Sequence, residues 1–126
     1  MTPREYQELA MRTRDDNADS RLITAVMHGA DHHTDTAQII TACMGLSGEV
    51  GELVDMFKKH IFHEKPLDDT HAIKELGDVL WYVALLCDAK GWDLETVMEL
   101  NIEKLKARYP EGFDIYRANH RGRDDV

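Results

Sequence analysis

The sequence predicts an all-α domain, and three observations support this prediction. Apolar residues recur at helical spacing over long stretches, capping residues stand at their starts, and no stretch alternates like a half-buried strand. The chain has 126 residues, enough for one domain with a single core. We therefore expect a helical bundle of four to five helices in one domain over residues 1–114, followed by a polar, mobile tail over residues 115–126.

The first helix is predicted from its N-terminal cap. Thr2 can cap the helix, Pro3 suits the first helical position, and Glu5 completes a capping box. We expect this helix to continue to about residue 16. In the less regular stretch 17–35, a short helix is expected over residues 21–27, ending near the Gly-Ala-Asp segment that follows.

A long second helix is predicted from about residue 36 to residue 60. Nine apolar residues recur there at helical spacing: Ile39, Ile40, Cys43, Met44, Leu46, Val50, Leu53, Val54 and Phe57. Gly45, Gly48 and Gly51 interrupt the pattern, and each glycine costs a helix interior about 1 kcal/mol relative to alanine. Their presence indicates close helix packing or an approach of the backbone to a ligand. Residues 61–70 form the connection to the next helix.

The third helix is predicted over residues 71–90, ending at Gly91. Every residue from 79 to 87 is apolar or aromatic, and a helix that is apolar all round is buried all round. A small monomer cannot bury such a segment completely, so we expect part of it to contact another subunit. The last helix is predicted to start within residues 93–96 and to run to about residue 108, where Tyr109 and Pro110 end it.

Composition narrows the functional classes. The formal net charge of −9 argues against nucleic acid or anionic membrane as a partner, because both require a basic surface. Cys43 and Cys87 lie in apolar stretches and are predicted to be reduced core residues. No Cys/His array has zinc spacing. The N-terminus is too polar for a signal peptide and no apolar run approaches membrane-spanning length, so we expect a cytoplasmic protein.

Two acidic pairs carry the chemical signal. Glu49 and Glu52 lie three residues apart in one predicted helix, and Glu75 and Asp78 lie three apart in the next. Residues at this spacing project from one side of a helix. Four unpaired carboxylates on inward helix faces would repel one another, and a hard divalent cation with oxygen ligands relieves that repulsion. The pattern favours metal-dependent phosphate chemistry, although a solvated acidic face is the common alternative for either pair alone.

Other polar residues share helix faces with these acids or lie on the last helix. Lys59 shares a stripe with Glu49 and Glu52, and Tyr82 shares one with Glu75 and Asp78. Asn101, Lys104 and Arg108 form a further stripe, which offers donors for phosphate oxygens.

Remaining candidates are interpreted as structural or surface residues. His60 and His63 straddle a helix end, and Trp81 and Trp92 suit a core or an interface better than base stacking. The motifs of phosphate-loop, dinucleotide-binding, zincin and serine-hydrolase mechanisms are missing, as is the Glu-x-x-His pair of di-iron bundles.

Three segments resemble those of the all-α nucleoside triphosphate pyrophosphohydrolases, and within them the chain is most similar to MazG-like proteins. The segments are GEVGEL, KELGDVLWYV and NIEKLKARYPEGF, and the first two contain the ExxE and ExxD pairs. The resemblance covers about residues 36–114, whereas residues 1–35 match less clearly. It implies an all-α bundle that assembles as a homodimer or homotetramer.

The resemblance also implies an activity. It suggests that Glu49, Glu52, Glu75 and Asp78 bind Mg²⁺, with Mn²⁺ as a substitute. It places phosphate and nucleotide contacts at five further residues: Lys59, Tyr82, Asn101, Lys104 and Arg108. The implied reaction cuts nucleoside triphosphates between the α and β phosphates. Its products are a nucleoside monophosphate and pyrophosphate, and its implied role is nucleotide-pool housekeeping.

In this mechanism Glu49 or Glu52, as the catalytic carboxylate, orients or deprotonates the attacking water. His32, His33 and Asp35 are candidates for contacts with the nucleobase, whose identity the sequence does not give. Two alternatives stay open. One is a phosphoribosyl-ATP pyrophosphohydrolase, and the other is a non-catalytic helical module for oligomerisation or regulation.

Overall fold

The computed structural model describes residues 1–122, and these residues are helical without any strand. The all-α prediction is therefore confirmed. The elements, in order, are α1 (Pro3–Ala10), the short 3₁₀ helix η1 (Met11–Thr13), α2 (Ala18–Asp31), α3 (Thr36–Phe62), α4 (Asp69–Lys90), α5 (Leu94–Arg108) and α6 (Ile115–Asn119).

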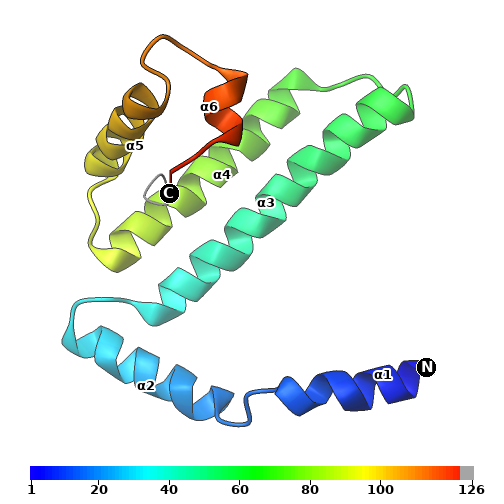
Figure 1. The fold of residues 1–126 in the computed structure, drawn as a ribbon, viewed down its shortest axis with the longest axis vertical. Coiled ribbons are helices and arrows are strands. Elements are labelled where there is room, and N and C mark those ends of the chain that lie inside the picture. Colours follow the sequence, from blue (N-terminus) through cyan, green and yellow to red (C-terminus); the bar gives the residue numbers. More distant parts are fainter. Residues whose placement is uncertain (123–126) are drawn as a thin grey trace.

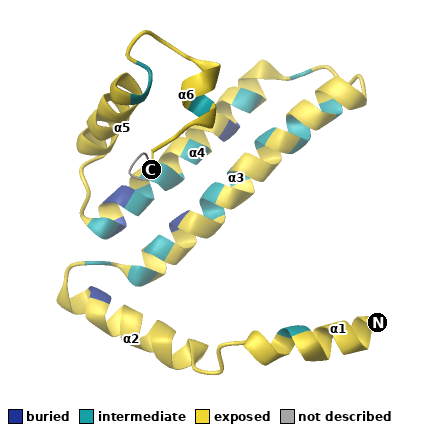
Figure 2. Cartoon of the chain, viewed as in Figure 1, coloured by how far each residue is buried: buried dark blue, intermediate teal, exposed yellow. Residues whose placement is uncertain are grey.

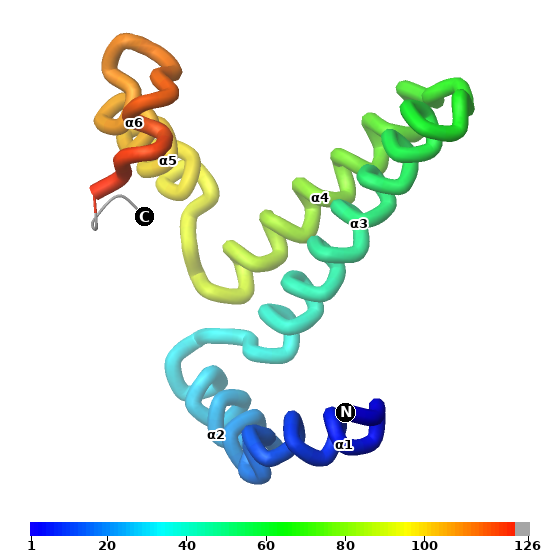
Figure 3. The backbone as a smooth tube through the Cα atoms, turned by 45° about the vertical axis from the view of Figure 1, so that its right-hand side comes forward, coloured from blue at the N-terminus to red at the C-terminus, as the bar shows by residue number. Residues whose placement is uncertain are grey.

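The central feature is a long antiparallel hairpin made of α3 and α4, which lie side by side (Figures 1 and 3). Each helix begins at an aspartate cap. Asp35 Oδ1 accepts a hydrogen bond from the Gln38 N–H at 3.1 Å, and Asp68 Oδ1 accepts one from the His71 N–H at 3.0 Å. Gly91 ends α4 with a left-handed φ of 66°. These caps define where the hairpin starts, turns and ends.

Close packing inside the hairpin depends on Gly45. A Cβ atom added at this position would lie 2.1 Å from Cε1 of Tyr82, so only glycine lets the Tyr82 ring sit against α3. Gly48 and Gly51 have open space around them instead. The helical glycines predicted to serve packing or ligand approach therefore divide: Gly45 serves packing, and the other two face free space.

The N-terminal helices form an arm that leaves the hairpin at the start of α3 (Figure 1). The Thr36 hydroxyl donates to the Ala25 carbonyl at 3.0 Å, and the Thr34 N–H donates to the Gly29 carbonyl at 2.8 Å. The Asp35 N–H donates to the Ala89 carbonyl at 2.9 Å, which joins this elbow to the end of α4. At the other end of the chain, α5 turns away from α4 and does not pack along the hairpin (Figures 1 and 3).

Few side chains are buried in the described part of the chain. Ala42, Cys87 and Ala89 form the buried apolar core, and no large side chain is fully buried. Exposed apolar residues occur on every helix (Figure 2). Leu80 and Trp81, in the segment predicted to contact another subunit, are 64% and 58% exposed. A single chain thus leaves many of its large apolar side chains exposed to water.

Several local predictions need correction. The first helix ends at Ala10 and continues only as a 3₁₀ turn, and α2 begins at residue 18 rather than 21. Within the predicted tail 115–126, residues 115–119 form α6, and residues 123–126 lie outside the described residues. Cys87 is a buried free thiol as predicted, whereas Cys43 is exposed in the single chain. Among the described residues, no helix combines the length and apolar character needed to cross a membrane.

Candidate metal centre and adjoining pocket

The antiparallel hairpin brings carboxylates from its two helices together. Glu49 and Glu52 come from the middle of α3, and Glu75 comes from the first half of α4. Each of these three residues offers a carboxylate oxygen, and the three oxygens all lie within 4.8 Å of one another. We call this group the acidic cluster. It brings together, from two separate segments, three of the four carboxylates that the sequence predicted as metal ligands.

The three residues of the acidic cluster differ in their exposure to solvent. Glu75 is buried, at 9% exposure, Glu49 is half-buried, and Glu52 is exposed. Partial burial raises the pKa of Glu49 above its ordinary value. The charge of Glu52, a hydrogen bond with the Glu75 carboxyl, and the charges of Asp78 and Glu75 raise this pKa further. The neighbouring carboxylates therefore make it harder for Glu49 to ionise.

Asp78, the fourth predicted ligand, lies near the acidic cluster but is not one of its members. It is exposed on α4, one turn beyond Glu75, and its charge contributes to the raised pKa of Glu49. Asp78 stays a predicted ligand, and its carboxylate is not among the three that lie within 4.8 Å of one another.

These residues fit a hard divalent cation. Carboxylate oxygens are the ligands that Mg²⁺ and Mn²⁺ prefer, and a small number of carboxylates plus substrate phosphates is the usual Mg²⁺ arrangement. Partial burial and the neighbouring carboxylates raise the pKa of Glu49, and a cation would offset the repulsion from those carboxylates.

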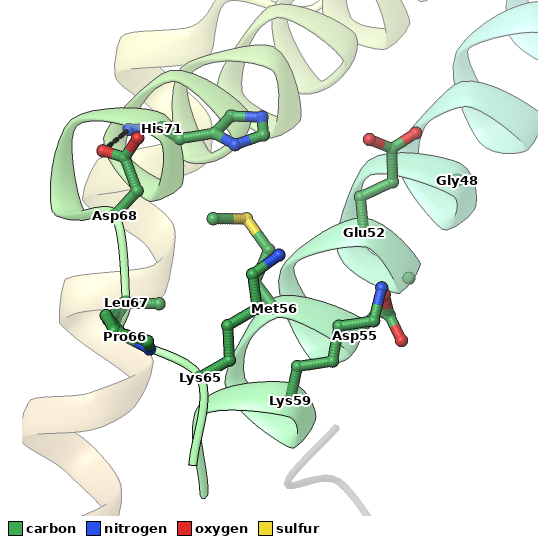
Figure 4. A pocket seen from close by; sticks show the side chains of 11 residues that line it. Gly48, Glu52, Asp55, Met56, Lys59, Lys65, Pro66, Leu67, Asp68 and His71 are labelled. Carbon is green, nitrogen blue, oxygen red and sulfur yellow. Dashed lines mark hydrogen bonds and ion pairs between the residues drawn. The ribbon is translucent and has the colours of Figure 1, made fainter. Parts of the chain in front are cut away.

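A pocket of about 480 Å³ adjoins the acidic cluster, between the two helices and the connection that joins them (Figure 4). It is lined by Gly48, Gly51, Glu52, Asp55, Met56, Lys59, Lys65, Pro66, Leu67, Asp68 and His71. Glu52 belongs to both the pocket and the cluster. Gly48 and Gly51 form part of the wall, and the absence of side chains at these positions leaves the α3 backbone accessible there.

Lys59, which the sequence analysis predicted to contact phosphate, is one of the residues that line this pocket. Its ammonium group pairs with Asp55 Oδ2 at 2.5 Å, and Lys58 pairs with the other oxygen of Asp55 at 2.7 Å. Hydrogen bonds from Lys58 and Lys59 lower the pKa of Asp55 to about 2. Asp55 therefore stays ionised at neutral pH and holds a cationic side chain at the pocket wall.

His71 contacts the acidic cluster directly. Its Nε2 lies 2.7 Å from Oε1 of Glu75, one turn further along α4, and His71 also lines the pocket. Figure 4 shows the His71 ring on α4 and Glu52 on α3 on opposite sides of the pocket.

The remaining predicted contact residues lie elsewhere. Tyr82 is half-buried against Gly45, and its ring meets Trp81 edge to face at 4.9 Å between centroids. The stripe on α5 is not brought to the acidic cluster within this chain, since α5 does not pack along the hairpin. It comprises Asn101, Lys104 and Arg108.

The residues considered for nucleobase contacts lie at the elbow between α2 and α3. His33 and Asp35 line a second cavity, of about 410 Å³, which shares no lining residue with the first. His32 is exposed at the end of α2. Within one chain, the structure does not join these residues to the acidic cluster.

Sequence reasoning missed several residues that line the pocket, among them Asp55, Lys65 and His71. For His71 a signal was available, because a histidine four residues before a glutamate on a helix can reach that glutamate. For Lys65 there was none, because it lies in the connection, whose path depends on how the two helices pack.

Comparison with known proteins defines the class. The MazG nucleotide pyrophosphohydrolase domain matches residues 38–113, more than half of the chain, so the chain belongs to this family. The resemblance found in the sequence is therefore confirmed. Membership indicates nucleotide pyrophosphohydrolase activity, a metal-dependent hydrolysis, and the acidic cluster supplies suitable ligands.

Among individual proteins, the chain is similar to the Gene 37 protein of Mycobacterium phage L5. The two are 36% identical over 95 residues, which make up 71% of this chain and 82% of the phage protein. No solved structure matches the chain.

Proposed function

We propose that this protein hydrolyses nucleoside or deoxynucleoside triphosphates between the α and β phosphates, with Mg²⁺ as its cofactor. Water adds to the α-phosphorus, the bond to the bridging oxygen breaks, and the products are a nucleoside monophosphate and pyrophosphate. The proposed role is nucleotide-pool housekeeping. The observation that carries the proposal is the acidic cluster, in which three carboxylates from α3 and α4 meet beside a pocket that contains Lys59.

The proposed cofactor is held by Glu49, Glu52 and Glu75, together with Asp78. When bound, Mg²⁺ neutralises phosphate oxygens and lowers the pKa of a water molecule at the site. Glu49 or Glu52 accepts the proton of the attacking water. The raised pKa of Glu49 makes its carboxylate a better proton acceptor than an ordinary glutamate.

Lys59 is the proposed contact of this chain for the departing pyrophosphate. Its ammonium group stands at the pocket wall, held there by Asp55. An ammonium group close to phosphate oxygens stabilises the negative charge that grows on the leaving group.

We further propose that the active form is a homodimer or homotetramer. The apolar side chains left exposed along α4 and α5 support this, because large apolar surfaces of soluble proteins mark interaction sites. In such an assembly, α5 of one copy supplies Asn101, Lys104 and Arg108 to the hairpin of another. Tyr82, whose ring packs against Gly45, is a further proposed contact for the nucleotide.

The test is a pyrophosphate-release assay on purified protein with standard and modified NTPs and dNTPs and with phosphoribosyl-ATP, each with Mg²⁺ and with EDTA. We expect metal-dependent release of pyrophosphate with a monophosphate product. The substrate ranking separates a (d)NTP hydrolase from a phosphoribosyl-ATP pyrophosphohydrolase. No release from any substrate, together with no metal binding, would leave the non-catalytic helical module as the explanation.

Glu52→Gln and Asp78→Asn test the ligand assignment within the same assay. Both side chains are exposed, so we expect the helical content to stay unchanged while activity falls by about 100-fold or more. Circular dichroism provides the folding control. Full activity in both single variants would overturn the assignment.

A further inference from the structure

The contact between His71 and Glu75 carries an inference about the metal centre. His71 lies in the first turn of α4, where its backbone N–H donates to Oδ1 of the capping residue Asp68 at 3.0 Å. From this fixed backbone its ring reaches forward one turn, and Nε2 lies 2.7 Å from Oε1 of Glu75. Asp68 thus holds the backbone of His71, and the Glu75 carboxylate holds its ring.

The two partners in this contact differ sharply in exposure. The His71 side chain is 57% exposed, whereas the Glu75 side chain is 12% exposed and belongs to the acidic cluster. Side-chain pairs four residues apart on a helix contribute little to stability. The effect of the contact therefore falls on the position of the Glu75 carboxylate rather than on the fold.

The geometry assigns a direction to the contact. A carboxylate only accepts hydrogen bonds, so the proton is on Nε2, where the ring carries it in its charged form and in one neutral tautomer. The contact engages Oε1, one of the two carboxylate oxygens of Glu75. Hydrogen bonds of this kind orient carboxylate ligands, and their loss typically weakens metal binding by about 10- to 100-fold.

We propose that His71 is a positioning residue for the metal centre: by donating to Oε1, it holds the buried Glu75 carboxylate in the conformation that receives the divalent cation. This inference rests on the proposed function, which makes Glu75 a metal ligand. His71 acts through Glu75, so its removal changes the affinity for metal first and the turnover with saturating metal much less.

Mn²⁺ binding to the protein without nucleotide, followed by electron paramagnetic resonance, tests the proposal. This measurement excludes any contact that His71 makes with a substrate in the pocket. We expect His71→Ala to weaken Mn²⁺ binding by about tenfold. His71→Gln places an amide N–H at similar reach, and we expect it to restore binding to within about threefold of the wild type.

The matched control is His63→Ala. His63 is an exposed histidine at the end of α3 that does not line the pocket, and we expect wild-type Mn²⁺ binding in this variant. Thermal melting of all three variants in EDTA checks that the fold is retained. The Mg²⁺ concentration for half-maximal pyrophosphate release should rise in His71→Ala in parallel with the Mn²⁺ dissociation constant.

The outcomes separate the two proposals. If the wild type binds Mn²⁺ and His71→Ala binds it equally well, the positioning role is wrong while the proposed function stands. If His71→Gln binds as weakly as His71→Ala, the ring itself and not its N–H donor is required, and the proposal is also overturned. If the wild type binds no Mn²⁺ and releases no pyrophosphate, the proposed function fails and this inference fails with it.

Discussion

At the scale of single residues, the acidic cluster places like charges close together, and the pKa of Glu49 is raised. Partial burial raises this pKa first, and the carboxylates of Glu52, Glu75 and Asp78 add to the effect. A carboxyl group whose pKa is raised by folding stabilises the folded state at low pH. That contribution is lost as the pH rises from the pKa of the unfolded chain through the pKa of the folded one. At neutral pH the metal-free cluster is thus a source of instability.

The first prediction concerns Glu49→Gln. Because this change removes one of the opposed charges, we expect the melting temperature in EDTA at pH 7 to rise above that of the wild type. As the pH is lowered from 7 toward the ordinary pKa of a glutamate, the wild type should gain stability relative to the variant. Saturating Mg²⁺ should stabilise the wild type and have a much smaller effect on the variant. Calorimetric melts over this pH range, with and without Mg²⁺, measure all three effects.

The second prediction uses two neighbouring lysines that share one partner. Lys58 and Lys59 both pair with Asp55, yet only Lys59 lines the pocket. We expect Lys59→Met to raise KM for the triphosphate by about tenfold, because a charged donor to phosphate is lost. Lys58→Met, the matched control, should change KM by about twofold at most. Equal effects from the two variants would show that the pairing with Asp55, and not a contact with substrate, is what matters.

At the scale of helices, the packing of α3 against α4 depends on a close approach at Gly45. The Tyr82 ring occupies the space that a side chain on Gly45 would need. This contact sets the separation of the two helices one turn before Glu49, so it also bears on the distance between the carboxylates.

The third prediction follows from this contact. We expect Gly45→Ala to lower the free energy of unfolding by about 2 kcal/mol, because the added methyl group meets the Tyr82 ring. The control is Gly77→Ala on α4, where an added Cβ has nothing within 4 Å. This change should raise the free energy of unfolding by about 0.5 to 1 kcal/mol through helix propensity. Urea denaturation at one fixed protein concentration compares them.

The main helices could be predicted from the sequence because apolar periodicity and end signals agree there. Asp35 and Asp68 cap the two long helices, and Gly91 ends the second. The predictions of helix ends failed where polar side chains form hydrogen bonds with backbone groups in place of helical hydrogen bonds. Asp15 accepts the Asn17 N–H at 2.9 Å and separates α1 from α2, which an apolar pattern does not show. The helix α6 is only five residues long, too short to leave a periodic signal.

The acidic pairs were also evident in the sequence, because their spacing places each pair on one helix face. The pocket was not, since Lys65 and Leu67 reach it from a connection whose path follows from helix packing. The direction of α5 depends on the backbone conformation of the short segment between α4 and α5, which the sequence pattern does not predict. For this reason the sequence could suggest Asn101 and Lys104 as contacts but not place them.

At the scale of the whole molecule, the described chain is an open arrangement of helices rather than a closed bundle (Figures 1 and 2). Its buried apolar core consists of small residues, while large apolar side chains remain exposed on α2, α3, α4 and α5. Association of copies offers a way to remove that surface from water.

The fourth prediction is that stability depends on protein concentration. We expect a dimer or tetramer in sedimentation velocity and a melting temperature that rises with concentration. Leu80→Glu should shift the distribution toward smaller species, because Leu80 is an exposed apolar residue in the segment predicted to contact another subunit. The control is Thr70→Glu, which changes the charge equally at an exposed polar position of α4 and should leave assembly unchanged. A wild-type monomer at all concentrations would contradict the prediction.

The hairpin also has a consequence for the order of folding. The acidic cluster and every residue lining its pocket lie between Gly48 and Glu75, a single uninterrupted stretch of chain. Contacts between segments joined by a short connection need little loop-closure entropy, and helical hairpins with such local contacts form fast. We therefore expect the carboxylates to meet early, while the chain is still alone. The slower step is the encounter of copies, whose rate depends on how much protein is present.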